Sequence, residues 1–236
     1  MLVVPFFQPI VDTQTSRIVG HEVLARELHN DGSITSASKR FNPHYFDIAE
    51  IIQLDRHIRA QALEAFAKQK QPGFITLNIS PEWLSNSSTI LPTIQLIEEY
   101  GIMPDKIVIE ITEHAGEIDH LLSAIASYRE KGLKIAVDDF GSGHSSFERV
   151  AQIKPDLIKI DMALFKAAVN GGMAATIVDT VRYFANKIDS LLLVEGVENF
   201  KEYLYGLSIQ CELMQGFIFD PALAQLQSGK KYHIEN

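Results

Sequence analysis

Polar side chains stand near the ends of successive apolar runs in this sequence. The clearest case is IAVDDFGSG, residues 135–143, in which an apolar run ends on two adjacent aspartates and a glycine-rich turn follows. A carboxylate taken out of water is costly unless a counter-charge or a metal ion compensates it. Other apolar runs carry similar groups, and the full set is Glu22, Asn78, Glu110, Asp138, Asp139, Lys159, Glu195 and Gln215.

These side chains have the chemistry of a site for hard divalent cations. Five carboxylates and one amide oxygen would repel one another unless cations lay among them, and oxygen donors without clustered Cys or His favour Mg²⁺ or Mn²⁺. Asp138 and Asp139 could each reach a different ion, or one of them could bridge both. Two ions roughly 3.5–4 Å apart are the usual arrangement for in-line displacement at phosphorus. We therefore predict two Mg²⁺ or Mn²⁺ ions, with Ca²⁺ as an inhibitor because its coordination is larger and looser.

Two basic residues suit the same chemistry. Lys159 offers a fixed positive charge for a phosphoryl oxygen or for orienting a metal-bound water. Arg26, four residues after Glu22, has the planar donor fork that matches a phosphate. Each feature taken singly has a more ordinary explanation, because strand-end carboxylates commonly cap helices and a lone lysine commonly reaches the surface. Their occurrence at the ends of seven successive apolar runs favours one shared site.

The elements that must position these residues are short apolar strands alternating with amphipathic helices. Strands are expected over residues 17–26, 74–80, 106–112, 133–139, 157–161, 191–196 and 211–217, and helices over 48–69, 90–100, 117–131, 172–187 and 199–207. Strands rich in Val, Ile and Leu and separated by helices indicate a parallel sheet covered by helices. About eight such units closing on themselves form a TIM-type barrel, in which all strand ends share one rim. An open, doubly wound sheet is the alternative architecture.

Length and composition fit one domain over residues 1–236. The formal charge of −9 argues against a protein that coats nucleic acid with a basic face. Residues 1–12 contain Pro5 and Pro9 and lack a signal-peptide pattern, so an edge strand is expected there. No apolar run reaches the length of about 18 residues that predicts a membrane span. The single cysteine, Cys211, cannot form an internal disulfide, which favours a reducing, cytoplasmic location.

The motifs and their order resemble those of the EAL-domain cyclic-di-GMP phosphodiesterases. FQPIVD resembles the family's opening strand, and HEVLAR stands where the signature Glu-Ala-Leu occurs; LNISP, IEITE, VDDFGSGHSS, LIKID, VEGVE and QGF follow. The resemblance covers nearly the whole chain. It implies a TIM-like (β/α)8 barrel modified with an antiparallel first strand. It also implies hydrolysis of one phosphodiester bond of cyclic-di-GMP to linear pGpG.

The resemblance implies a role for each member of the polar set. The metal ligands would be Glu22, Asn78, Glu110, Asp138, Asp139 and Glu195. Water activation would fall to Glu195 and Lys159, with Glu22 as a further catalytic residue. The substrate would be contacted by Arg26, Leu24 and Gln215, with Arg26 at a phosphate.

Other implied features concern the surroundings of the site. Glu113 would anchor the loop 140–146, which in the family couples dimer contacts to metal binding, so a homodimer is expected. Glu198 would support the site from outside the ligand set. The sequence departs from the family pattern at Val23, which replaces the signature alanine, and at Asp47, which replaces a usual proline. In the loop, Ser142 and His144 stand where Thr and Tyr are more common, but no expected metal ligand is missing.

Two rival functions remain open at this point. One is a module of the same fold that binds cyclic-di-GMP or a protein partner without turnover, which would be expected to have lost ligands. The other is a barrel enzyme that abstracts a proton beside a carboxylate with the help of Mg²⁺.

Overall fold

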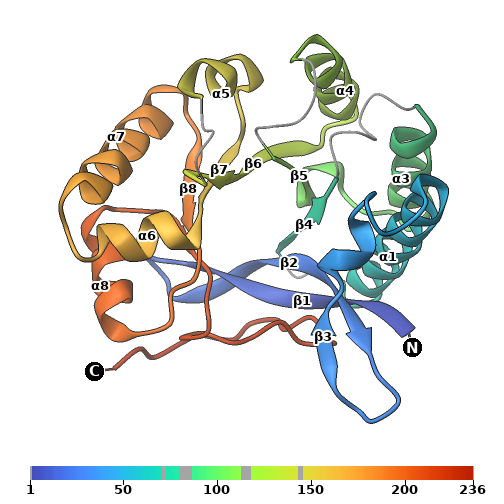
Figure 1. Cartoon of the computed structure of the whole chain (residues 1–236), viewed down its shortest axis with the longest axis horizontal. Coiled ribbons are helices and arrows are strands. Elements are labelled where there is room, and N and C mark those ends of the chain that lie inside the picture. The colour runs from blue at the N-terminus through green and yellow to red at the C-terminus, as the bar shows by residue number, and fades with distance from the viewer. Residues whose placement is uncertain (1, 71–72, 80–86, 113–117, 143–145, 236) are drawn as a thin grey trace.

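The fold is a closed barrel of eight strands surrounded by helices (Figure 1). The computed structural model describes residues 2–70, 73–79, 87–112, 118–142 and 146–235. The barrel strands are β1 (Leu2–Asp12), β2 (Arg17–Leu28), β4 (Phe74–Asn78), β5 (Ile107–Thr112), β6 (Lys134–Phe140), β7 (Leu157–Ile160), β8 (Leu191–Val194) and β9 (Leu213–Met214). A short strand, β3 (Ile34–Ser36), pairs with the outer part of β2. The prediction of a barrel is confirmed.

Closure of the barrel depends on β1, which pairs antiparallel with β2 along its length and with β9 at Val11 and Asp12. The pairs from β2 through β4, β5, β6, β7 and β8 to β9 are all parallel. An antiparallel first strand is therefore confirmed, and the open-sheet alternative is excluded. The expectation that residues 1–12 form an edge strand is wrong, because β1 has a partner on each side.

The prolines of β1 are tolerated because they occupy positions whose backbone groups face away from β2. Phe7 donates its N–H to Leu223 O and accepts from Leu223 N, at 2.7 and 2.9 Å, so its backbone groups face away from β2. Pro5 and Pro9 lie two residues to either side and share that orientation. A proline at these positions therefore removes no donor from the ladder with β2, which is the condition for proline in a strand.

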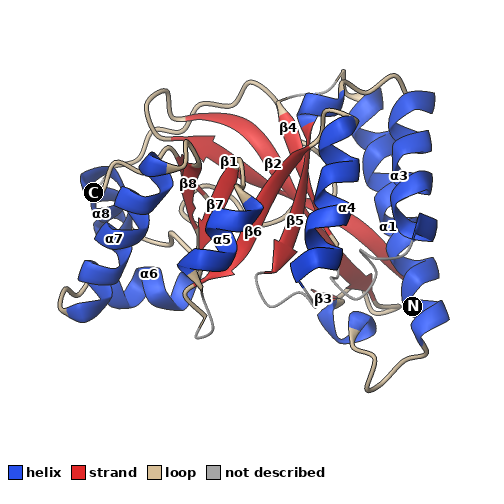
Figure 2. Ribbon diagram, turned by 90° about the horizontal axis from the view of Figure 1, so that it is seen from above, coloured by secondary structure: helices blue, strands red, loops and turns tan. Residues whose placement is uncertain are grey.

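The helices lie around the outside of the strands, and Figure 2 shows α4 beside β5 and α5 beside β6. They are α1 (Ile48–Lys68), α3 (Ser87–Glu99), α4 (Ile118–Glu130), α5 (Phe147–Ile153), α6 (Met162–Ala168), α7 (Met173–Lys187) and α8 (Phe200–Ser208), with single turns at η1 (Ser38–Phe41) and η2 (Pro104–Lys106). The five predicted helices are confirmed. Helices α5 and α6 were not predicted, because seven residues are too few to establish a helical period. None of the described helices is long and apolar enough to cross a membrane.

Asp47, which departs from the family pattern, has a clear local role. It is the N-cap of α1, and its side chain accepts a hydrogen bond from Ala49 N at 2.8 Å. An aspartate here satisfies one of the free N–H groups of the first turn and suits the positive end of the helix dipole. The missing proline therefore costs the helix nothing at its start.

Alternation along the strands separates two apolar regions. One cluster fills the inside of the barrel and consists of Ile10, Val108, Ala136, Leu157, Leu193 and Leu213. The larger cluster lies between the strands and the helices and takes the intervening strand residues, such as Ile109, Ile135 and Ile158. Because side chains alternate with a period of two, the residue two positions after each inward apolar residue also points inward. That next layer contains Glu110, Asp138 and Lys159.

The buried Cys211 gives a simple test of this packing. Its thiol donates to Gly206 O at 3.2 Å, and burial, assisted by Glu212, raises its pKa to about 12 although Arg182 opposes the shift. Because the thiolate is the reactive form, we expect a disulfide reagent at pH 8 to label the native thiol about a thousandfold more slowly than the unfolded thiol. Absorbance of the released chromophore, with and without guanidinium, measures the two rates. Similar rates would show that Cys211 is accessible.

Candidate metal centre

The predicted polar residues meet at the carboxyl ends of the barrel strands. Glu22 lies in β2, Asn78 ends β4, and Glu110, Asp138 and Lys159 lie in β5, β6 and β7; Glu195 and Gln215 follow β8 and β9 directly. The register places Asn78 beside Glu110, while Gln215 N donates to Val194 O and so continues the ladder. The interior of the barrel is therefore apolar in one layer and polar in the next.

Lys159 lies at the centre of this polar layer. It is fully buried, and its Nζ lies 2.8 Å from Glu195 Oε1, 2.9 Å from both Glu110 Oε1 and Asp138 Oδ1, and 3.3 Å from Glu22 Oε1. Burial alone would lower the pKa of Lys159, but these four carboxylates raise it well above its ordinary value. The lysine is therefore held as a cation inside the barrel.

One ammonium cannot balance four carboxylates. Burial raises the pKa of Glu110 well above its usual range, and Glu22 and Asp138 add to the rise against the effect of Lys159. Burial likewise raises the pKa of Glu195 to about 8, with Asp138 and Glu22 contributing and Lys159 opposing. The Oε2 atom of Glu110 is buried and has no hydrogen-bond partner in the described part of the chain. A buried carboxylate oxygen without a hydrogen-bond donor from the protein is typical of a metal ligand.

The carboxylates form two overlapping groups of three. Ligand oxygens of Glu22, Glu110 and Asp138 lie within 4.8 Å of one another, and so do those of Asp138, Asp139 and Glu195. Asp138 belongs to both groups. All of these ligand atoms are oxygen, so the residues present fit one or two hard divalent cations and offer no soft ligand for zinc or copper.

A distortion of β6 explains how two adjacent aspartates serve one site. Successive strand residues normally point to opposite faces. Here the pairing of β6 with β7 shifts between Val137 and Phe140, and Asp139 adopts a left-handed conformation with φ +56°. The extra residue turns the Asp139 carboxylate toward those of Asp138 and Glu195. Burial and the neighbouring Asp138 raise the pKa of Asp139.

Gln215 joins the cluster through Glu22, because its side-chain N–H donates to Glu22 Oε2 at 2.5 Å. The amide oxygen of Gln215 is buried without a partner among the described residues. Leu24 and Arg26 follow Glu22 at intervals of two on β2 and therefore share its face. Arg26 is half-buried and donates to Ala25 O at 3.1 Å. Burial lowers its pKa, and Glu22 acts in the opposite direction.

Two predicted supporting residues have different outcomes. Glu198 lies 2.8 Å from Lys166 of α6 in an ion pair, and its backbone N–H donates to Glu202 Oε2. The structure gives it no contact with the carboxylate cluster among the described residues, so its role in supporting the site stays a prediction. Glu113 and His144 lie outside the described residues. Ser142 donates its N–H to Asp139 O at 3.1 Å, which ties the start of the loop 140–146 to the cluster.

Two further buried polar groups, the imidazole of His21 and the carboxylate of Glu202, were not predicted from the sequence. His21 is fully buried, and its Nε2 accepts from Gln227 N at 3.1 Å; burial lowers the pKa of His21 to about 4. Glu202 is the buried acceptor of the Glu198 N–H. His21 and Val23 flank Glu22 in the strand, so their side chains point to the face opposite that of Glu22. This alternation was the only sequence signal that His21 faces the outer core.

Proteins of known family resemble this chain in sequence and structure. The EAL domain family model matches residues 2–222. The probable cyclic di-GMP phosphodiesterase PdeI of Escherichia coli K12 is 31% identical over 239 residues, which cover 95% of this chain and 30% of PdeI. The crystal structure of Bacillus subtilis YkuI, in complex with cyclic-di-GMP and calcium, matches with a TM-score of 0.83 and 28% identity over 96% of this chain and 56% of that one. A standalone EAL protein from Vibrio cholerae O395, bound to cyclic-di-GMP, matches with a TM-score of 0.85 and 26% identity, covering 96% and 95% of the two chains. The chain spans half or less of the length of the curated relatives YkuI and PdeI.

The buried lysine predicts how the metal-free protein responds to mutation. Replacing Lys159 with methionine leaves four carboxylates without their cation, and loss of one partner of a buried ion pair costs about 3–5 kcal/mol. We expect Lys159→Met to lower the free energy of unfolding by that amount in EDTA, as measured by urea denaturation. The surface variant Lys68→Met, which removes only an exposed pair with Glu64, should change it by less than about 1 kcal/mol. Equal stabilities of the two variants would contradict a central electrostatic role for Lys159.

Proposed function

Because the chain belongs to the EAL domain family, we propose that it hydrolyses cyclic-di-GMP to linear pGpG at the carboxylate cluster with divalent cations bound there. The observation that carries the proposal is the pair of carboxylate groups that share Asp138. Two adjacent oxygen sites with one common ligand suit a pair of cations acting on a phosphodiester. The complete ligand set distinguishes this chain from a barrel that has lost its chemistry.

The residues divide naturally between the two cation positions. Glu22 and Glu110 would hold one Mg²⁺ or Mn²⁺ with Asp138, and Asp139 and Glu195 would hold the other with the same Asp138. Asn78, beside Glu110 in the register, would add an amide oxygen. The cations would polarise the phosphoryl oxygens and lower the pKa of the attacking water.

The chain's own charged groups would carry the remaining steps. Glu195, held as a carboxylate by the bound cation and by Lys159, would help to remove a proton from the attacking water. Lys159 lies 2.8 Å from Glu195 and would stabilise negative charge that develops on the phosphoryl oxygens. The water oxygen bonds to phosphorus as the bond to the ribose 3′ oxygen breaks, and that oxygen takes up a proton. The product keeps a 5′ phosphate and a free 3′ hydroxyl.

Substrate contacts are proposed on the same rim. Arg26 shares the Glu22 face of β2 and would bind a phosphate, while Leu24 lies between the two and would offer an apolar surface to a base or sugar. Gln215, fixed by Glu22, has an amide oxygen without a partner in the described ranges, and this oxygen would accept a hydrogen bond from the nucleotide. The homodimer expected from the resemblance stays a prediction.

The alternative function is binding of cyclic-di-GMP without turnover. This alternative keeps the same cluster but assigns it to recognition, as in a sensor. The complete set of carboxylates and the buried Lys159 favour catalysis, because recognition alone would not need the overlapping groups. The two functions differ in one observable, the appearance of pGpG.

The decisive experiment is incubation of the protein with cyclic-di-GMP and Mg²⁺ or Mn²⁺, followed by chromatography of the products. We expect pGpG, no product in EDTA, and turnover at least about a hundredfold lower in Asp138→Asn, because that substitution removes the ligand common to both cation positions. Asp179→Asn, an exposed change on α7, is the matched control and should keep normal turnover. Tight nucleotide binding without product would indicate the sensor, and normal turnover in Asp138→Asn would refute the metal assignment.

Calcium provides a second test of the same centre. Ca²⁺ accepts more ligands at longer distances than Mg²⁺ and fixes geometry less strictly. We expect Ca²⁺ to support nucleotide binding but to suppress hydrolysis, with inhibition relieved by excess Mg²⁺. Product analysis at fixed Mg²⁺ and increasing Ca²⁺ measures this competition. Full turnover with Ca²⁺ alone would argue against a strictly defined pair of cation positions.

A further inference from the structure

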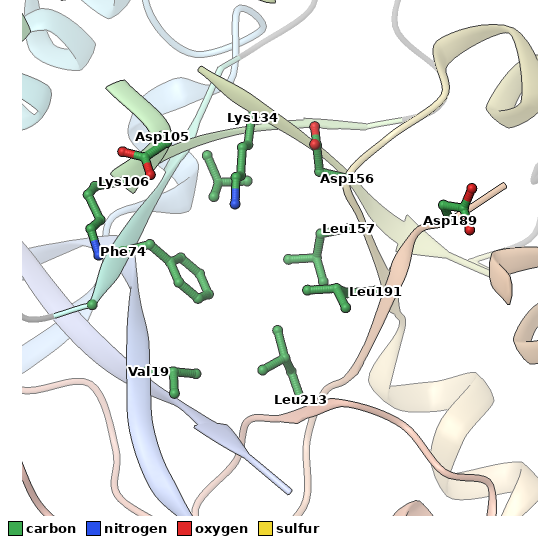
Figure 3. Close-up of a pocket in the computed structure, with 12 residues that line it drawn as sticks. Val19, Phe74, Asp105, Lys106, Lys134, Asp156, Leu157, Asp189, Leu191 and Leu213 are labelled. Atoms are coloured by element: carbon green, nitrogen blue, oxygen red, sulfur yellow. The ribbon is translucent and has the colours of Figure 1, made fainter. Parts of the chain in front are cut away.

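A second cavity opens at the opposite end of the barrel from the carboxylate cluster. It has a volume of about 360 Å³, within the range of small-molecule sites. Its apolar walls are Val19, Phe74, Val108, Leu157, Leu191 and Leu213 (Figure 3). All of them lie at or near the amino-terminal ends of parallel strands or on the facing part of β2.

One layer of side chains separates this cavity from the metal centre. Val108 precedes Glu110 by two residues on β5, and Leu157 precedes Lys159 by two residues on β7. Leu213 precedes Gln215 in the same way. Val108, Leu157 and Leu213 of the inner cluster therefore line the cavity and also lie directly below the polar layer. The cavity is a separate site, because none of its lining residues belongs to the carboxylate cluster.

The apolar surface of the cavity is incompletely covered by the protein itself. Leu191 begins β8 and is 47% exposed, and Phe74 is only partly buried although it packs against the inner cluster. Figure 3 shows the side chains of Val19, Phe74, Leu157, Leu191 and Leu213 directed into the same space. An apolar body placed there would remove these surfaces from water, which is favourable in proportion to the area covered.

The charged residues at the mouth are two lysines and three aspartates. Figure 3 shows the ammonium of Lys134 directed toward the middle of the cavity and that of Lys106 beside Phe74. In the part of the chain that the structure describes, neither lysine forms an ion pair. Of the three acidic residues at the mouth, Asp156 accepts from Ile135 N at 2.9 Å, and Asp105 and Asp189 lie at the outer edges with their carboxylates turned away.

We propose that this cavity binds a small amphipathic organic anion, with an apolar ring or short chain inside the barrel mouth and an acidic group at Lys134 and Lys106. A neutral apolar molecule would leave both ammonium groups unused, whereas an acidic group in the middle of the cavity would meet the ammonium of Lys134. An anion gains charge-assisted hydrogen bonds from lysines that have no ion-pair partner among the residues described. This site is independent of the proposed phosphodiesterase activity, because it lies beyond the inner apolar layer.

The test uses two fluorescent probes with nearly the same ring system. 1-Anilinonaphthalene-8-sulfonate carries an acidic group, and N-phenyl-1-naphthylamine lacks it. Titrations in EDTA keep the carboxylate cluster unattractive to anions. We expect saturable binding of the sulfonate probe, an affinity about tenfold lower in Lys134→Gln because a charged hydrogen bond is lost, and no such change for the neutral probe. Lys68→Gln, a charge removal on the exposed face of α1, should change neither titration.

A second variant tests the location. Leu191 is partly exposed, so Leu191→Trp can fill the cavity without disturbing the core, and it should weaken both probes at least about tenfold. Competition by 4-phenylbutyrate at concentrations well below those needed for 4-phenylbutanol should show that a carboxylate can replace the sulfonate. The proposal is overturned if the sulfonate probe does not saturate, or if its affinity is the same in the unaltered protein, in Lys134→Gln and in Leu191→Trp.

Discussion

The imbalance of charge around Lys159 is the constraint on which the rest of the structure depends. One ammonium lies within 3.3 Å of four carboxylates, in a barrel interior that screens charges far less than bulk water does. The lysine makes the assembly of these side chains possible, but it leaves negative charge and, among the residues that the structure describes, a buried Glu110 oxygen without a hydrogen-bond partner. The same imbalance that weakens the empty protein supplies the driving force for binding a divalent cation. The repulsion that lowers the stability of the metal-free protein is therefore the same repulsion that raises its affinity for a divalent cation.

Much of this arrangement could be predicted from the sequence because the barrel repeats a simple rule. An inward apolar residue followed two positions later by a polar one appears as Val108 and Glu110, and again as Leu157 and Lys159. A period of two is visible in sequence, and a parallel barrel brings equivalent positions to one rim. The left-handed conformation of Asp139 could not be predicted, because the apolar pattern of a strand does not show where a bulge occurs. An aspartate does not by itself indicate this conformation. The closure of β1 onto β9 was missed because pairing between distant segments leaves no local signal.

The apolar and polar layers of the barrel interior have different roles. The apolar layer of Val108, Leu157 and Leu213 supplies burial and holds the strands in register, and the polar layer above it concentrates charge. Because both layers belong to the same short strands, a shift of one strand along its axis would move a ligand and a packing residue together. Short strands with fixed register, such as the four residues of β7, therefore suit a site in which several ligand atoms must lie within 4.8 Å of one another.

The antiparallel contacts of β1 with residues 213–214 and 223 have a consequence for synthesis on the ribosome. The hairpin of β1 and β2 can form as soon as it emerges, but Val11 must wait for Met214 and Phe7 for Leu223. Until then one side of β1 and the open side of β8 expose unpaired backbone groups, which are prone to pairing with other chains. Contacts separated by some 200 positions also make closure slow relative to local steps. The ring therefore remains incomplete until residues 213–223 have been made.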